Sequence, residues 1–156
     1  FKNPKNTLTI GDDVYKLQQF HFHAPSENEI DGQTYPLEGH FVYKTDNGKI
    51  TVISVLYNYG DENLALKQIW DKMPQAANTE IELPQPISLD DFYPEDKDYY
   101  NFEGSLTTPP CTEGVNWIVF KNQETVSKEQ VEKFTQTLGF ENNRPIQDTN
   151  GRKIKE

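Results

Sequence analysis

The chain has 156 residues, enough for one domain of ordinary size with a single core and little room for a second. Its 25 Asp and Glu residues against 15 Lys and Arg residues give a net charge of −10, which argues against nucleic acid as a partner, because a phosphate backbone would be repelled. No run of about 20 apolar residues is present, so no membrane partner is expected either.

The N-terminal half of the sequence predicts three strands. Residues 14–23 alternate between two sets of side chains with a period of two, which is typical of a strand. A polar stretch at Asp31-Gly32 allows the chain to reverse, so a second strand over residues 37–44 is expected to pair antiparallel with the first. Beyond another turn signal, the β-branched run at residues 50–57 predicts a buried third strand. One face of the first strand is expected to carry Tyr15, Leu17, Gln19, His21 and His23.

The C-terminal half predicts two helices and one further long strand. Apolar residues at helical spacing predict a helix within residues 61–73. The proline-containing acidic segment 74–98 is expected to be a long loop with one short strand near residues 80–83. Residues 115–121 alternate as a strand does, and a capping box over residues 127–130 predicts the start of the second helix. These elements place the chain in the mainly β class, with peripheral α-helices.

The three histidines of the sequence all fall between residues 21 and 40. His21 and His23 are two apart on a strand, so they share a face at about 6 to 7 Å between Cα atoms, and His40 can return to that face from the neighbouring strand. Three imidazole ligands without an evident fourth protein ligand describe a catalytic zinc site rather than a structural one. Gln19 and Glu38 lie on the same face and can accept from the remaining ring N–H groups.

The alternative for these histidines is an ordinary structural role, in which each ring is satisfied by hydrogen bonds in a partly polar interior. For a single histidine we would favour that interpretation. Three of them on one face, with the amide of Gln19 beside His21 and the carboxylate of Glu38 beside His40 on that face, favour the metal site instead.

Four segments resemble the α-class carbonic anhydrases, particularly the bacterial ones. They are Gln19-Phe20-His21-Phe22-His23, Ser26-Glu27, Glu38-Gly39-His40 and Gly104-Ser105-Leu106-Thr107-Thr108-Pro109-Pro110-Cys111. The resemblance runs on through residues 142–145 and 150–152, so it covers essentially the whole chain. It implies a large, mostly antiparallel twisted sheet with peripheral α-helices. It also implies that residues 1–156 are the C-terminal two-thirds of a single carbonic anhydrase domain, incomplete at the N-terminus.

The resemblance implies a zinc lyase that reversibly hydrates carbon dioxide to bicarbonate and a proton through attack of zinc-bound hydroxide. The residues that match the zinc ligands are His21, His23 and His40. Thr107 matches the residue that accepts a hydrogen bond from the hydroxide, and Glu27 matches the carboxylate that takes the proton of Thr107. Without the resemblance, Glu27 and Thr107 would be read as a surface carboxylate and a turn hydroxyl.

The resemblance also assigns the surroundings of the zinc. Thr108 matches a group that contacts bicarbonate or bound anions, and sulfonamide or anion inhibitors are expected at the metal. Gln19 and Glu38 match residues that hold the zinc-bound rings. An apolar wall suits a nonpolar gas molecule, because polar groups there would hold water. The wall positions are Val42, Val52, Leu106, Val115 and Trp117.

The sequence departs from the family in three ways. The missing third would carry the proton shuttle, and because all three histidines are used as ligands, we expect slow turnover limited by proton transfer to buffer. It would also carry the cysteine that bacterial relatives pair with Cys111, whose alternative role is that of a small buried hydrophobe. Phe102 stands where a tyrosine is usual, which would loosen the hydroxyl network behind the threonine. Asn28 stands after Glu27, where relatives frequently have a histidine. This position is not expected to contact the zinc or its ligands directly.

Two alternative functions remain open at this stage. One is an inactive binding or scaffold module of the same family, against which the three intact histidines argue. The other is an esterase side activity of the same zinc site. A periplasmic or secreted location follows from the family, although the sequence shows no signal peptide, and bacterial relatives suggest a homodimer.

Overall fold

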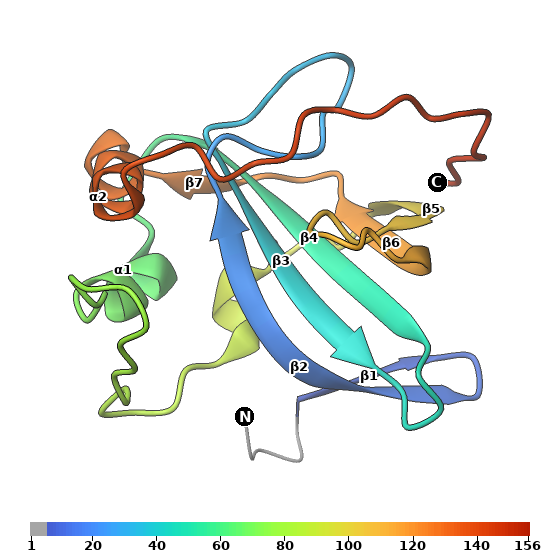
Figure 1. Cartoon of the computed structure of the whole chain (residues 1–156), viewed down its shortest axis with the longest axis horizontal. Helices are drawn as coiled ribbons and strands as arrows, with labels where there is room; N and C mark the ends of the chain where they lie inside the picture. The colour runs from blue at the N-terminus through green and yellow to red at the C-terminus, as the bar shows by residue number, and fades with distance from the viewer. Residues whose placement is uncertain (1–5) are drawn as a thin grey trace.

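The computed structural model describes residues 6–156, which form one twisted sheet with two helices beside it (Figure 1). The strands are β1 (Thr7–Ile10), β2 (Asp13–His23), β3 (Leu37–Lys44), β4 (Ile50–Tyr59), β5 (Tyr99–Ser105), β6 (Glu113–Phe120) and β7 (Glu124–Val126). The helices are α1 (Leu64–Trp70), the short 3₁₀ helix η1 (Leu89–Phe92) and α2 (Lys128–Leu138). Within these residues no helix has both the length and the apolar character needed to cross a bilayer.

The sheet is mixed, which refines the expected mostly antiparallel arrangement. Its strand order is β1-β2-β3-β4-β6-β5, with β7 added to β4. The pairs β1–β2, β2–β3, β3–β4 and β5–β6 are antiparallel, whereas β4 pairs with β6 and β7 in parallel. A parallel pair needs a long crossover between its strands. Here α1, the long loop and β5 supply that crossover between β4 and β6.

Most predicted elements are present, with shifted ends. The second strand is confirmed at Leu37–Lys44, and the first and third are each extended slightly, to Asp13–His23 and Ile50–Tyr59. The helix predicted within residues 61–73 is shorter, because its first turn is capped by the side chain of Asn63, which accepts from the N–H of Leu66. The capping box that begins α2 is confirmed.

The short strand predicted near residues 80–83 is wrong, and three strands were missed. Residues 80–83 are mostly exposed coil, and the prolines that follow them remove the N–H donors that pairing would need. The missed strands β1 and β7 have only four and three residues, too few for an alternating pattern to show. The missed β5 (Tyr99–Ser105) mixes polar and aromatic residues and directly follows the acidic loop, so its alternation was not recognised.

The expected uninterrupted alternation along β2 is also wrong. The register against β3 shifts at Gln18, so that Leu17 lies opposite Tyr43 but Gln19 lies opposite Val42. Such a bulge inserts one extra residue and exchanges the two faces of the strand beyond it. Leu17 therefore belongs to the main core, whereas Gln19 and the histidines beyond it lie on the opposite face.

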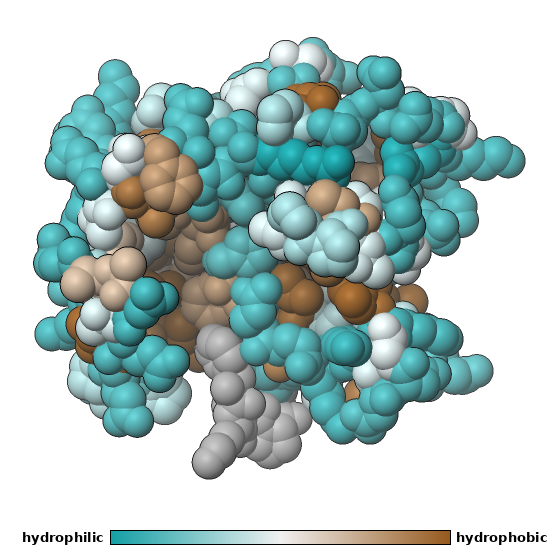
Figure 2. All heavy atoms as spheres, viewed as in Figure 1, coloured by the Kyte–Doolittle hydropathy of each residue, from teal (hydrophilic) through white to brown (hydrophobic). Residues whose placement is uncertain are grey.

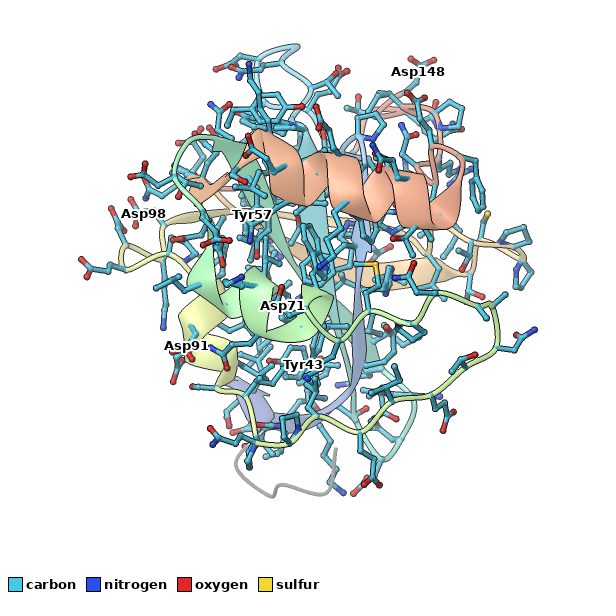
Figure 3. The ribbon with its side chains drawn as sticks, turned by 90° about the vertical axis from the view of Figure 1, so that its left-hand side faces the viewer. Tyr43, Tyr57, Asp71, Asp91, Asp98 and Asp148 are labelled. Atoms are coloured by element: carbon cyan, nitrogen blue, oxygen red, sulfur yellow. The ribbon has the colours of Figure 1, made fainter. Side chains whose placement is uncertain are left out.

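Each face of the sheet carries its own core. The main core lies between the sheet and the helices, and Figure 3 shows α1 and α2 in front of the strands that carry Tyr43 and Tyr57. The second core covers the other face and consists of Tyr35, Val52, Leu56, Val115, Trp117 and Val119. Polar side chains dominate the outer surface, and apolar residues show in separate patches left and right of centre in Figure 2.

Candidate metal centre

The three histidines meet where the end of β2 pairs with the middle of β3. His21 lies directly opposite His40 in the β2–β3 register, and His23 follows two residues later on the same face of β2. The ring centroids are 4.9 Å apart for His21 and His23, 5.4 Å for His21 and His40, and 4.7 Å for His23 and His40. One ring nitrogen of each lies within 4.8 Å of the others. The predicted convergence of three imidazoles is therefore present.

Each ring lies against a different acceptor, and two of the three make a hydrogen bond to it. The Nδ1 of His21 lies 2.8 Å from Oε1 of Gln19, and the Nδ1 of His23 lies 2.9 Å from the backbone carbonyl of Asn142. Because a carbonyl oxygen only accepts, both Nδ1 atoms carry the proton and both Nε2 atoms keep a free lone pair. The Nε2 of His40 lies 2.9 Å from Oε1 of Glu38 without hydrogen-bond alignment, so this buried nitrogen has no hydrogen-bond partner among the described residues. The Nδ1 of His40 lies 3.8 Å from Oε2 of Glu27.

These rings fit a metal ion. The Nε2 of His23 is buried and has no hydrogen-bond partner among the described residues, a costly state for a polar atom unless a ligand completes it. Burial, followed by repulsion from His40 and His23, lowers the pKa of His21 to about 3. Burial and His40 also lower the pKa of His23. Neutral imidazoles are the form that binds metal, and three of them match the ligand set of a catalytic zinc site.

Glu38 is a buried carboxylate with a full set of donors. It is 0 % exposed and accepts from the backbone N–H of Glu27 at 2.6 Å and from that of Asn28 at 2.9 Å. The Asn28 side chain and the Ser54 hydroxyl donate to its other oxygen. Burial raises the pKa of Glu38, but His40 and the side-chain hydrogen bonds outweigh it and hold the pKa at about 2. Glu38 therefore presents a fixed negative charge to the ring of His40.

Glu27 lies beside the histidines with one carboxylate oxygen to spare. Its side chain is 2 % exposed, and Oε1 accepts from the backbone N–H of Arg144 at 2.6 Å. Its Oε2 is buried without a hydrogen-bond partner within residues 6–156 and lies 3.8 Å from Nδ1 of His40. This unpartnered oxygen can accept a hydrogen bond, and the family resemblance implies that the donor is the hydroxyl of Thr107.

The expected hydrogen bond from Thr107 to Glu27 is not formed among the described residues. Both residues line one cavity of about 440 Å³, together with Phe102, Trp117 and Arg144. Thr108 is exposed, and its carbonyl accepts from the N–H of Cys111 at 2.9 Å, closing a turn. The roles assigned to Thr107 and Thr108 therefore stay predictions.

The five wall positions lie together next to the rings. Three of them, Val52, Val115 and Trp117, belong to the second core, and the other two, Val42 and Leu106, pack against it. The indole of Trp117 lies edge-on to the imidazole of His40, with 4.9 Å between ring centroids. An apolar surface therefore reaches directly to the candidate metal ligands.

Three residues at the site were missed or underrated by sequence reasoning. Asn142 holds His23 although 119 residues separate them, so no local pattern announces the contact. Ser54 donates to Glu38 from β4, where the β3–β4 register places it opposite His40. Asn28, expected to lie away from the direct path to the metal, contacts the carboxylate that holds His40.

Comparison with known proteins decides the family. The profile of the eukaryotic-type carbonic anhydrases matches residues 2–156. The chain belongs to this family. The carbonic anhydrase of Neisseria gonorrhoeae is 48% identical over 151 residues, covering 97% of this chain and 60% of the relative. That of Pectobacterium carotovorum is 46% identical over 152 residues, covering 97% and 62%.

Solved structures of carbonic anhydrases share the fold. The α-carbonic anhydrase of Photobacterium profundum superposes with a TM-score of 0.94 at 44% identity, covering 99% of this chain and 70% of that one. The α-carbonic anhydrase of Thermovibrio ammonificans in complex with the inhibitor sulfanilamide gives 0.92 at 47% identity, covering 94% and 65%. The chain thus spans about 60% of the length of the curated carbonic anhydrases it matches.

Proposed function

We propose that this carbonic anhydrase chain catalyses the zinc-dependent, reversible hydration of carbon dioxide to bicarbonate and a proton. The observation that carries the proposal is the partly buried group of three imidazoles, with one ring nitrogen of each within 4.8 Å of the others and an unpartnered Nε2 on His23. The apolar wall beside His40 adds a place for a nonpolar substrate. Family membership supports the same chemistry.

In this proposal His21, His23 and His40 hold the zinc. When bound, the ion supplies a Lewis acid that lowers the pKa of a water molecule to near 7. The contacts of the three rings keep their free nitrogens aimed at one point, so that little reorganisation accompanies metal binding.

Glu27 and Thr107 orient the attacking oxygen. Glu27 Oε2 is free to accept the hydroxyl proton of Thr107. Thr107 then has only lone pairs to offer, so it accepts a hydrogen bond from the attacking oxygen and turns a lone pair of that oxygen toward the substrate carbon. Thr108 contacts the bicarbonate product.

The wall excludes water from the substrate position. Trp117 and Val52 are 4 % and 1 % exposed and present apolar atoms on the side of the site where His40 lies. The free energy of carbon dioxide falls when it moves from water to such an apolar surface, whereas a water molecule there would lose hydrogen bonds.

Further properties belong to the same proposal. Sulfonamide or anion inhibitors would bind at the metal, as the complex of the Thermovibrio ammonificans relative with sulfanilamide suggests. A periplasmic or secreted location, a homodimer and a disulfide between Cys111 and a cysteine outside these residues are proposed from the family. Cys111 is a half-buried free thiol in the described chain.

The test combines metal analysis with stopped-flow carbon dioxide hydration on the purified, refolded chain. The proposal expects about one zinc per chain and hydration that stops when the metal is removed and returns when it is restored. Folded protein that takes up less than about one zinc contradicts the proposal and favours a binding module. Zinc uptake with ester hydrolysis but without carbon dioxide hydration favours the esterase.

A further inference from the structure

The segment after α2 returns across the end of β2 (Figure 1). There Asn142 makes three hydrogen bonds, to the last two residues of the strand and to the residue that follows it. Its side-chain Oδ1 accepts from the backbone N–H of Ala24 at 2.9 Å, and its side-chain Nδ2 donates to the carbonyl of Phe22 at 2.8 Å. Its backbone carbonyl accepts from Nδ1 of His23 at 2.9 Å. Asn142 thus contacts three consecutive residues, of which the middle one is the candidate metal ligand His23.

The side-chain amide of Asn142 substitutes for a neighbouring strand. In a β-ladder a strand offers one donor and one acceptor to its partner's backbone groups, and the carboxamide does the same on either side of His23. No ladder positions residue 142, because residues 140–149 contain no helix or strand. The two side-chain bonds therefore determine where the carbonyl of Asn142 lies.

The position of that carbonyl matters because His23 has a second acceptor within reach. Glu27 Oε1 lies 3.3 Å from the same Nδ1. A ring that turned toward Glu27 would move its Nε2 away from His21 and His40 and would engage the carboxylate that Thr107 needs. The backbone N–H of Arg144, two residues after Asn142, already occupies Glu27 Oε1 at 2.6 Å.

We propose that the side chain of Asn142 is a positioning device for His23: it docks onto the edge of β2 so that its own carbonyl directs the ring of His23 toward the metal. The inference rests on the metal site of the proposed function. Any residue at position 142 would have a backbone carbonyl to offer to His23. The inference is that the asparagine side chain is needed to hold this carbonyl in place.

The experiment compares Asn142→Ala with Asn143→Ala, a neighbouring asparagine whose side chain makes no hydrogen bond to the rest of the described chain. Zinc affinity is measured by competition with a chelator, and the absorption spectrum of the cobalt-substituted protein reports the ligand geometry. Asn142→Ala is expected to weaken zinc binding roughly 10- to 100-fold, the range for losing an outer contact of a metal ligand, and to alter the cobalt spectrum. Asn143→Ala is expected to match the wild type in both.

A second measurement keeps the test independent of the metal. In metal-free protein, the nitrogen-15 and proton shifts of the Nδ1–H group of His23 are expected to change in Asn142→Ala, because the hydrogen bond moves toward Glu27. Asn142→Asp, which keeps the acceptor for Ala24 but loses the donor to Phe22, serves if the alanine variant does not fold. Wild-type affinity, cobalt spectrum and shifts in a folded variant would overturn the positioning role. A wild-type chain that binds no zinc overturns the proposed function instead, and the shifts of metal-free protein then decide the role of Asn142.

Discussion

At the scale of single residues, the candidate site depends on three rings that each bring one free nitrogen. His40 is the only one of the three on β3, and its side chain is 2 % exposed. Removing it leaves two ligands, both on β2, which cannot enclose an ion from two sides. We therefore expect His40→Ala to abolish tight zinc binding in a chelator competition. Retained wild-type affinity would contradict the ligand assignment.

Thr107 allows metal binding and turnover to be separated. Its hydroxyl is assigned to orienting the attacking oxygen and not to holding the ion, so Thr107→Ala is expected to keep about one zinc per chain while losing most carbon dioxide hydration, roughly 100-fold. Thr112→Ala is the matched control, since Thr112 lies in the same loop and contributes only its backbone carbonyl, to the N–H of Leu106. Loss of zinc from Thr107→Ala would place the residue among the groups that hold the metal.

Tyr57 offers a test of burial without hydrogen bonding. It is 0 % exposed and its hydroxyl has no partner within the described chain, so Tyr57→Phe is expected to raise the free energy of unfolding by about 1 kcal/mol in urea titration. The hydroxyl of Tyr43 lies 2.8 Å from that of Tyr93, so Tyr43→Phe is expected to lower stability by about 1 kcal/mol. Equal effects of the two changes would contradict the assignment.

The same tyrosine predicts a dependence of stability on alkaline pH. Burial, followed by the charge of Glu124, raises the pKa of Tyr57 above its ordinary value near 10. Because the folded chain holds this proton more tightly than the unfolded chain, its contribution to stability is complete below about pH 10 and is lost as the pH rises toward the folded pKa. Tyr57→Phe is therefore expected to lose less stability than the wild type above pH 10.

At the scale of elements, the bulge in β2 decides which side chains meet the metal. Deleting Gln18 would restore uninterrupted alternation and put either Tyr15 and Leu17, or the two histidines, on the wrong face. Exposing the two apolar residues would cost at least about 3 kcal/mol. We expect the deletion to lower the unfolding free energy by that amount or to abolish zinc binding.

The control for the deletion is Gln18→Ala, which keeps the extra residue and removes only an exposed side chain that donates to the carbonyl of Lys16. It is expected to change stability by less than about 0.5 kcal/mol. A deletion variant with wild-type stability and wild-type zinc binding would show that the bulge has no such role.

At the same scale, elements with a strong local period were predictable and the others were not. Leu37–Lys44 alternates cleanly and is flanked by turn signals, so its bounds were predicted correctly. The bulge carries no distinct residue type, because Gln18 looks like any exposed strand position. The strand wrongly expected near residues 80–83 shows the converse, since a short apolar alternation next to prolines remains coil.

At the scale of the whole molecule, the small number of histidines leads to a prediction about proton transfer in the proposed reaction. The chain has three, and all three belong to the candidate metal centre. Histidine is the side chain whose ordinary pKa suits proton transfer near neutral pH. We therefore expect carbon dioxide hydration by this chain to be slow and to rise with the concentration of an added imidazole buffer. Fast turnover that is independent of buffer would contradict this expectation.

The family was recognised from short motifs spread along the whole chain, whereas local order in the amino-acid sequence was enough to recognise the alternating strands, the pair of histidines on one face of β2, and the acceptors Gln19 and Glu38. These features depend on residues a few positions apart, where backbone geometry alone relates one side chain to the next. Folding in three dimensions was needed for the exchange of faces at Gln18, the mixed pairing of β4 and the carbonyl of Asn142 against His23. Those depend on how distant segments pack, which no local periodicity encodes.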